Sequence, residues 1–298
     1  MAVLLWLVLA LSGTEAGVVL KPVANLYSAP TDDADVVTQA IYGTSVTLVE
    51  KKEGWAKVRM PDEYAGWIPF ASIKVQPESE RLYACCGRVA QVESLFANVY
   101  REPEVTRHQP ILTVPFETRL EVAAEPEKEE GRWLQVRLPD DRPGWIQRGD
   151  ITLEPRQLSI KETIELARRF LGLPYFWGGT SAFGYDCSGF MQMLYRRQGV
   201  LMPRDAAPQS RWPKLQPVLF NKLRPGDLLY FGRSPEKITH TGMYIGHGQF
   251  IHATTNQHPV VQISRVKEPR WGKLLVAARR LRERPPTQAA LTAAAWAK

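Results

Sequence analysis

The sequence predicts a multidomain protein in which two small all-β barrels precede an α+β domain. Three observations predict this fold class. The chain has 298 residues, which is enough for two or three domains. Its first half contains a repeat with short β-rich runs, and its second half changes to helical spacing followed by strands. With 44% hydrophobic and 23% charged residues, the composition excludes disordered, collagen-like and coiled-coil classes.

The chain opens with an apolar run over residues 2–11, followed by small residues and Ala16. This pattern is typical of a secretory signal, and we expect residues 1–16 to be one. No lysine or arginine precedes the run, so a mis-assigned start or an ordinary apolar N-terminus stays open as the alternative. The run is shorter than the ~20 apolar residues that cross a bilayer, and no other segment qualifies. We therefore expect no integral membrane segment in the mature chain.

The repeat predicts one β domain over residues 17–76 and a linker with a second, similar domain over residues 77–155. The motif ANLYSAP at 24–30 is echoed by ANVYREP at 97–103, an offset of 73 residues. Gly-Trp-Ile at 66–68 recurs at 144–146, an offset of 78 residues. Short β-rich runs bounded by Gly, Pro and Asp lie between these motifs, at the spacing of a five- or six-stranded barrel.

Residues 156–284 are predicted to form the α+β domain, and residues 285–298 a flexible tail. Residues 160–171 have apolar side chains at helical spacing and lead into a loop rich in glycine. A second helix is expected to begin at Cys187 and to end near residue 197. Strands are expected at 228–231, 240–246 and 250–253, and the last two would be joined as a hairpin through Gly246-His247-Gly248.

Cys187 is the first candidate for chemistry because it opens a predicted helix. The partial positive charge of a helix N-terminus favours a thiolate and is expected to lower the pKa of the thiol from its ordinary ~8.5. The hairpin would bring His240 and His252 onto adjacent strands. The cysteine would then be a nucleophile, one imidazole its base, and the second imidazole the group that orients the first. A buried structural cysteine and neutral core histidines are the alternative.

No metal or cofactor is expected at these residues. A zinc ion would need more ligands than Cys187, His240 and His252, and no C-x-x-C or H-x-x-x-H pair accompanies them.

Five blocks of the second half closely resemble, in order, the NlpC-type cell-wall cysteine peptidases. The blocks are PYFWGG at 174–179, GYDCSGF at 184–190, PRDA at 203–206, PGDL at 225–228, and HTGMYIG at 240–246 with HA at 252–253. The resemblance implies a papain-like α+β fold in which Cys187 attacks, His240 is the base and His252 is the third polar residue. It also implies that the substrate is a peptidoglycan stem peptide, cut between the γ-carboxyl of D-glutamate and a diamino acid.

The motifs of the first half resemble bacterial SH3-like domains, which accompany many cell-wall enzymes. With Arg204-Asp205-Ala206, this layout resembles the γ-D-glutamyl-L-diamino acid endopeptidases that act on muropeptides with a free N-terminal L-alanine. The resemblance implies that Asp205 binds the substrate's ammonium group and that a tyrosine of the first SH3-like domain closes the site. We choose Tyr64 for this tyrosine. The alternatives are a helix N-cap for Asp205 and a solvated loop residue for Tyr64.

Further substrate contacts are expected around the nucleophile. Asp186 would contact the substrate amine or cap the helix, and the Cys187 amide would bind the oxyanion. Tyr175 would donate a hydroxyl hydrogen bond. The remaining candidates are Ser188, Ala206 and Trp177, the last on the pocket rim.

Three functions stay open from the sequence. The first is a cysteine peptidase that releases L-Ala-γ-D-Glu from free muropeptides. The second is an endopeptidase that holds intact wall through its SH3-like domains, and the third is a non-catalytic wall-binding protein. The signal predicts a secreted, periplasmic or envelope location, whereas recycling of free muropeptides fits the cytoplasm.

The basic charge of the chain is local. The net charge is +7, and residues 267–284 contribute five of these charges through seven basic and two acidic residues. This stretch is a candidate contact for an anionic cell-wall polymer, with an ordinary solvated face as the alternative. No nucleic-acid-binding motif accompanies it, so no nucleic-acid partner is expected.

Overall fold

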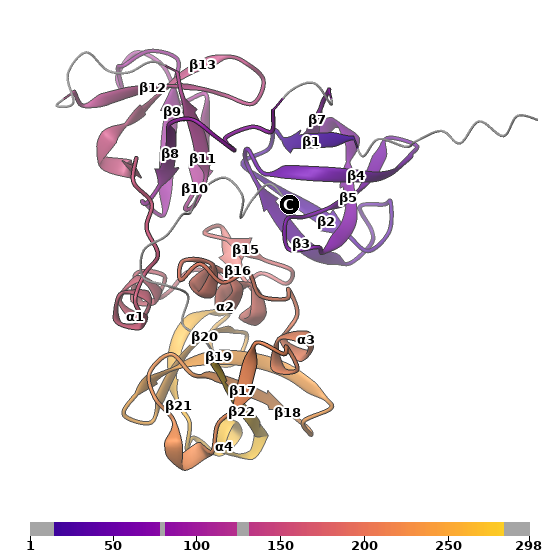
Figure 1. Ribbon diagram of the computed structural model, residues 1–298, viewed down its shortest axis with the longest axis vertical. Helices are drawn as coiled ribbons and strands as arrows, with labels where there is room; N and C mark the ends of the chain where they lie inside the picture. Colours follow the sequence, from indigo (N-terminus) through magenta and orange to yellow (C-terminus); the bar gives the residue numbers. More distant parts are fainter. Residues whose placement is uncertain (1–14, 78–80, 124–130, 283–298) are drawn as a thin grey trace, which may run out of the picture.

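The computed structural model describes residues 15–77, 81–123 and 131–282, and these are mostly strand with four short α-helices. Two β units lie side by side at one end of the molecule, helices α1 and α2 lie in the middle, and a six-stranded sheet forms the other end (Figure 1). In the described ranges, no helix is both long and apolar enough to cross a membrane. Residues 1–14 of the predicted signal and the whole predicted tail lie outside the described residues. Ala16 opens the first strand.

The N-terminal half forms two seven-stranded antiparallel sheets with the same strand order. The first has the order β3-β2-β6-β5-β4-β1-β7 and the second β10-β9-β13-β12-β11-β8-β14, so every strand has its counterpart seven positions later. The strands of the first sheet are β1 (Ala16–Val19), β2 (Val23–Tyr27), β3 (Val36–Ile41), β4 (Ser45–Lys52), β5 (Trp55–Arg59), β6 (Ala65–Pro69) and β7 (Ile73–Gln76). Those of the second are β8 (Val89–Val92), β9 (Phe96–Tyr100), β10 (Leu112–Pro115), β11 (Arg119–Val122), β12 (Trp133–Arg137), β13 (Pro143–Gln147) and β14 (Ile151–Thr152).

The glycines of the repeated Gly-Trp-Ile motif are needed because two strands approach closely at this point. A Cβ on Gly66 would lie 2.9 Å from Leu26, and a Cβ on Gly144 would lie 2.6 Å from Val99. Leu26 and Val99 are equivalent residues of the repeat and are fully buried. Each sheet thus closes around its own apolar core at the position that the repeat marks.

The C-terminal half combines helices with an antiparallel sheet of order β17-β22-β18-β19-β20-β21. Helix α1 begins with a capping box, in which the Ser159 hydroxyl and the Glu162 carboxylate each accept from the other's backbone N–H. The elements are α1 (Ile160–Arg169), β15 (Thr180–Ser181), β16 (Gly184–Tyr185), α2 (Cys187–Arg196), α3 (Ala206–Ser210), β17 (Leu215–Pro217), β18 (Leu228–Gly232), β19 (Ile238–Gly246), β20 (Gln249–Thr254), β21 (Val260–Arg265), α4 (Pro269–Leu274) and β22 (Leu275–Leu281). Both predicted helices and the predicted strands are present.

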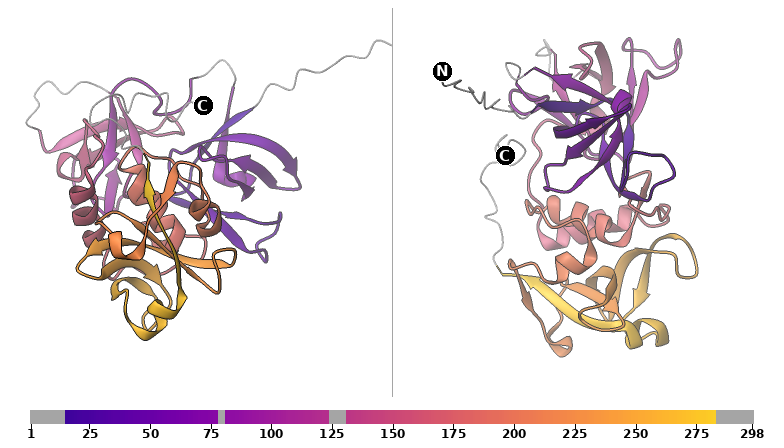
Figure 2. Two further views of the ribbon diagram at one scale, coloured as in Figure 1. Left: turned by 60° about the horizontal axis from the view of Figure 1, so that its bottom comes forward. Right: turned by 90° about the vertical axis from the view of Figure 1, so that its right-hand side faces the viewer.

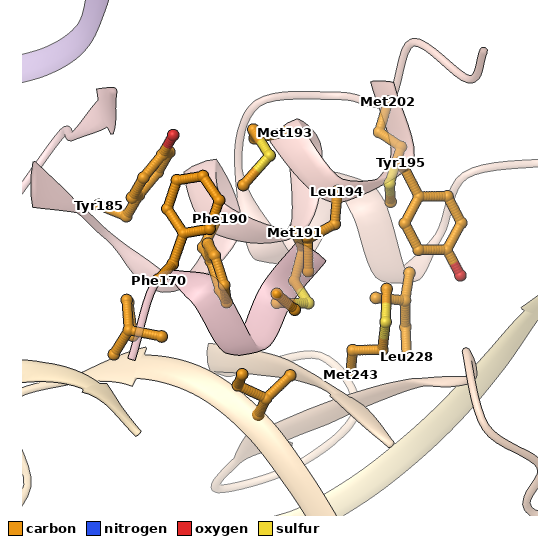
Figure 3. Close-up of a cluster of buried hydrophobic side chains, with 14 of the residues drawn as sticks. Phe170, Tyr185, Phe190, Met191, Met193, Leu194, Tyr195, Met202, Leu228 and Met243 are labelled. Atoms are coloured by element: carbon orange, nitrogen blue, oxygen red, sulfur yellow. The ribbon is translucent and has the colours of Figure 1, made fainter. Parts of the chain in front are cut away.

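Helix α2 is the centre of this half. Every residue from Cys187 to Tyr195 is buried. Figure 3 shows Phe190, Met191 and Leu194 of α2 among the surrounding apolar side chains, with Leu228 and Met243 contributed by the sheet. The right-hand view of Figure 2 shows the helices between the N-terminal sheets and the six-stranded sheet. Helix α2 is therefore packed on both sides.

The first N-terminal sheet docks on the loop and the helix around Cys187. Gln39 Oε1 accepts from the Thr180 backbone N–H and from the Ser181 hydroxyl, both at 3.1 Å. The Thr180 hydroxyl donates to the Gln39 carbonyl (3.1 Å). Gln192 of α2 donates to Asp62 Oδ2 (2.7 Å). These contacts fix one wall of the region around Cys187.

The second N-terminal sheet docks on the other end of α2 through an ion pair. Arg196 Nη2 lies 2.6 Å from Glu117 Oε2, and their side chains are only 19% and 10% exposed. The positive charge of a guanidinium buried to this extent must be compensated by its carboxylate partner.

The basic stretch at 267–284 is partly engaged within its own domain. Arg280 Nε donates to Asp227 Oδ1 (2.6 Å), and Arg279 Nε donates to the Ser210 carbonyl (2.8 Å). Arg270 lies over the Trp271 ring. Binding of an anionic polymer by this stretch stays a prediction.

We expect Glu117→Gln to lower the free energy of unfolding by about 3–5 kcal/mol, because Arg196 would stay buried without its counter-charge. Urea denaturation followed by tryptophan fluorescence measures this change. Lys51→Gln is the control, since Lys51 and Glu15 form an ion pair with side chains 47% and 49% exposed, and such pairs contribute at most about 1 kcal/mol. Equal shifts for the two variants would contradict the structural role of the buried pair.

Candidate active site

Cys187 is the first residue of α2, and the residue before it caps the helix. Asp186 Oδ1 accepts from the Gly189 backbone N–H at 2.7 Å. A Cβ on Gly189 would lie 2.2 Å from the Gly179 carbonyl oxygen, so this first turn packs directly against the glycine loop. Cys187 is 8% exposed. The local sequence therefore fixes the thiol at a helix N-terminus that is almost closed to water.

The two histidines meet across the hairpin, as predicted. His240 of β19 and His252 of β20 are joined by a hydrogen bond of 2.7 Å between His240 Nε2 and His252 Nδ1. The turn has positive φ at His247 (53°) and Gly248 (72°), which is typical of a two-residue hairpin. A Cβ on Gly242 would lie 3.0 Å from the His252 Cβ, so glycine leaves the room that His252 needs.

An aromatic cluster surrounds the histidine pair. The Trp271 ring, carried by α4 and 2% exposed, stacks on the His240 ring at 5.0 Å with an interplanar angle of 26°. It meets His252 edge-on at 4.8 Å. Phe231 and Phe250 pack against the same tryptophan. These rings keep water away from the hydrogen bond between the two imidazoles.

Burial decides the protonation of the thiol and of the imidazole. Burial, together with the Asp186 charge, raises the pKa of Cys187 to about 12, although the Thr241 N–H acts to lower it. Burial also lowers the pKa of His240 to about 3, with a smaller contribution from Arg270. The Ser188 N–H in the first turn of α2 acts to lower the thiol pKa, as predicted, but burial outweighs it, so the expected net lowering of the Cys187 pKa is wrong for the substrate-free protein. The proton rests on sulfur, and the imidazole is neutral.

The sulfur of Cys187 lies beside β19. The backbone N–H of Thr241, the residue after His240, is hydrogen-bonded to it. Because Nε2 of His240 is occupied by His252, Nδ1 is the ring nitrogen left for the thiol. The structure thus brings Cys187, His240 and His252 together from α2, β19 and β20.

Tyr64 and Asp205 come together across the domain boundary. The Tyr64 hydroxyl donates to Asp205 Oδ2 at 3.2 Å. Burial, together with the Asp205 charge, raises the pKa of Tyr64 to about 12, so the hydroxyl keeps its proton. Asp62 orients the loop, because its Oδ1 accepts from the Tyr64 backbone N–H (3.1 Å). Asp205 stands at the N-cap position of α3, yet its side chain makes no capping bond.

Arg204 is a buried residue of the site to which the sequence assigned no role. Its guanidinium donates to Asp186 Oδ1 (3.1 Å), to the Ser188 hydroxyl (3.0 Å) and to the Thr38 hydroxyl of β3 (3.0 Å). Asp186 and Ser188 are therefore engaged by the protein itself, and of the two alternatives for Asp186 the structure shows the helix cap. The sequence places Arg204 in the PRDA block, but an arginine in a loop is ordinarily solvated, so neither its burial nor its contacts could be predicted.

The other predicted contacts lie around the same point. Tyr175 is half-buried, and besides burial the neighbouring Cys187 and Asp186 raise its pKa. Trp177 is 69% exposed, which excludes a core position and fits a rim. A Cβ on the next residue, Gly178, would lie 2.6 Å from the Val36 carbonyl oxygen of the first sheet. Ala206 is buried as the first residue of α3.

No metal ligand set accompanies these residues in the part of the chain that the structure describes. There, no three His, Cys, Asp or Glu side chains are grouped as they would be to hold an ion.

Two family models match the chain. The NlpC/P60 family matches residues 172–280, and the bacterial dipeptidyl-peptidase SH3 domain matches residues 26–73. These matches confirm both resemblances that the motifs indicate. They cover the site on both sides, because Tyr64 lies in the second range and Cys187, Asp205, His240 and His252 lie in the first.

Relatives with curated names match most of the chain. It is 32% identical to the γ-D-glutamyl-L-lysine dipeptidyl-peptidase of Bacillus cereus, over 82% of this chain and 74% of that one. The enzyme of the same name from Bacillus subtilis is 28% identical over 83% and 82%. A crystal structure of an NlpC/P60 family protein from Bacillus cereus matches with a TM-score of 0.76 and 27% identity, over 91% of this chain and all of that one.

Burial of the Cys187 thiol predicts how its rate of alkylation depends on pH. In Cys85→Ser/Cys86→Ser, which leaves Cys187 as the chain's only cysteine, the rate of alkylation by iodoacetamide should still be rising above pH ~8.5, the ordinary pKa of cysteine. The physical reason is that the buried thiol keeps its proton while His240 is neutral. A plateau between about pH 5 and pH 8 would instead reveal a preformed thiolate–imidazolium pair and contradict the argument.

Proposed function

The chain belongs to the NlpC/P60 family of cysteine peptidases, and from this premise we propose that it hydrolyses the γ-D-glutamyl-diamino acid bond of peptidoglycan stem peptides. The substrates are those with a free N-terminal L-alanine, and the product is L-Ala-γ-D-Glu. The observation that carries this proposal is the hydrogen bond between Tyr64 and Asp205 at the boundary of the peptidase domain. The relatives named γ-D-glutamyl-L-lysine dipeptidyl-peptidase support the choice of bond.

Asp205 and Tyr64 are suited to recognise an ammonium group. A carboxylate can pair with the ammonium, and the tyrosine oxygen can accept a further hydrogen bond from it. An N-acylated stem has no such charge and would leave the carboxylate without a counter-charge in a partly closed site. Specificity for the free amine thus arises because an N-acylated stem cannot neutralise the Asp205 carboxylate.

The reaction follows from the protonation of the site. As the Cys187 sulfur bonds to the carbonyl carbon, its proton moves to Nδ1 of His240. The Cys187 amide, at the start of α2, donates to the developing oxyanion. The C–N bond then breaks, and His240 returns the proton to the leaving amine. Water hydrolyses the resulting thioester by the same route, which releases the acyl product and restores the thiol.

The first sheet is proposed to be an SH3-like wall of the substrate site, since Tyr64 reaches the peptidase domain from it. We propose that the second sheet is a module of the same kind, because the strand order and the close-packed glycine recur in it. The C-terminal half would be papain-like: its nucleophile opens a helix that packs on an antiparallel sheet carrying the base.

The location of the reaction remains a prediction. The envelope is the natural place for an enzyme of peptidoglycan peptides, and a signal over residues 1–16 would deliver the chain there. The cytoplasm remains the alternative for recycled muropeptides.

The function is tested by mass spectrometry of products from L-Ala-γ-D-Glu-diaminopimelate, its L-lysine analogue and purified intact sacculi, with Cys187→Ala as the inactive control. We expect L-Ala-γ-D-Glu from the free peptides and no product from sacculi. Cleavage of sacculi would make the protein a wall-remodelling endopeptidase. If no substrate is cut, the peptidase assignment fails and a wall-binding role takes its place.

Variants of the recognition pair should weaken cleavage of the free peptide. We expect Asp205→Asn to lower kcat/KM by about 100-fold or more, because the ammonium loses its counter-charge. Tyr64→Phe should lower it by about 10-fold, the effect of one hydrogen bond to a charged group. Tyr27→Phe, a tyrosine of the same sheet that packs on Trp55, is the matched control and should leave kcat/KM unchanged. Wild-type rates for both recognition variants would contradict the proposal.

A further inference from the structure

A hydroxyl group lies at the buried end of the histidine pair. Ser264 Oγ is 3.1 Å from His252 Nε2, and His252 Nδ1 is 2.7 Å from His240 Nε2. Ser264 stands on β21, opposite Phe250 of β20, and is 7% exposed. His252 is 0% exposed. Three strands therefore carry one continuous chain of hydrogen bonds from Ser264 to His240.

We propose that Ser264 is a positioning residue that sets the tautomers of His252 and His240, so that His240 faces the Cys187 thiol with an unprotonated Nδ1. The inference rests on the proposed function, because it concerns the proton that Cys187 gives up. It adds a fourth member to the site beyond the cysteine and the two histidines.

Counting protons gives two arrangements for a chain of two neutral imidazoles. In the first, His252 Nε2–H donates to Ser264, His240 Nε2–H donates to His252 Nδ1, and Nδ1 of His240 is bare. In the second, every donor is reversed: Ser264 donates to His252 Nε2, and His240 carries its proton on Nδ1. Only the first arrangement leaves His240 able to accept the thiol proton.

The acceptor at Ser264 matters most once His240 has taken that proton. The imidazolium then has protons on both nitrogens, so its Nε2–H must donate to His252 Nδ1. His252 must therefore carry its own proton on Nε2, where the hydroxyl of Ser264 accepts it. Without the hydroxyl this buried N–H would lose the acceptor that the structure shows for it, and the charged state would be disfavoured. The effect falls on kcat rather than on KM, because it acts as the charge develops.

The experiment compares Ser264→Ala, Ser264→Thr and Thr254→Val in the full chain. Thr254 lies on β20 with His252 and is 4% exposed, but its hydroxyl accepts from the Asn256 backbone N–H and is no part of the chain of hydrogen bonds. Histidine tautomers are read from the imidazole nitrogen signals of ¹⁵N-histidine-labelled protein. Steady-state kinetics use L-Ala-γ-D-Glu-L-Lys.

In the wild-type protein we expect the His240 signals of an Nε2-protonated ring. Ser264→Ala should convert them to those of an Nδ1-protonated ring and lower kcat by about 10- to 100-fold, with KM within about twofold. Ser264→Thr should restore both, and Thr254→Val should change neither. If Ser264→Thr misfolds, the presence or absence of the tautomer shift in Ser264→Ala still decides whether Ser264 sets the tautomers.

Unchanged tautomers in Ser264→Ala would overturn the inference, even if kcat falls, because the serine would then be only structural. A wild-type His240 protonated on Nδ1 would also overturn it. The nuclear magnetic resonance result is independent of the substrate. A wild-type protein that cuts no stem peptide therefore refutes the proposed function, while the tautomers still test the role of Ser264.

Discussion

The contact between Arg204 and Asp186 is the interaction on which the site depends. Asp186 caps α2 and so places Cys187, while Arg204 neutralises it and also holds the Thr38 hydroxyl of the first sheet. The residue after Arg204 is Asp205, which meets Tyr64. One buried guanidinium thus joins the nucleophile helix to the docked sheet, and the next residue of the chain is Asp205. Because Arg204 and Asp186 are both buried, loss of one would leave the charge of the other without compensation.

The second constraint is the exclusion of water from the thiol and the histidines. Trp271, Phe231 and Phe250 shield the imidazoles, and the same burial keeps the Cys187 thiol protonated. Because the Cys187 thiol and the His240 imidazole are both neutral, the thiol can give up its proton only to a ring nitrogen of His240 that is unprotonated and faces it. The orientation and tautomer of His240 are therefore important for the reaction. In the proposed reaction, the start of α2 stabilises the oxyanion that develops on the substrate. This stabilisation favours transfer of the proton from Cys187 to His240.

Local patterns in the sequence were sufficient for the helix that Cys187 opens and for the hairpin that joins His240 to His252. Both depend on residues close in the chain. The pKa direction of Cys187 was predicted wrongly, since it is decided by burial that residues remote in the sequence create. Arg204 was overlooked for the same reason: only the folded chain shows that its loop is closed over by β3. The Tyr64–Asp205 pair, 141 residues apart, came from family resemblance, because no spacing rule connects two domains.

In the proposed function, the boundary between the first sheet and the peptidase domain reads a free amine beside the nucleophile. The most direct measurement is a crystal structure of Cys187→Ala with L-Ala-γ-D-Glu-diaminopimelate bound. We expect the alanine ammonium within hydrogen-bond distance of the Asp205 carboxylate and the Tyr64 oxygen, with the γ-glutamyl carbonyl at the start of α2. A peptide bound with its amine in solvent, or with another group against Asp205, would contradict it.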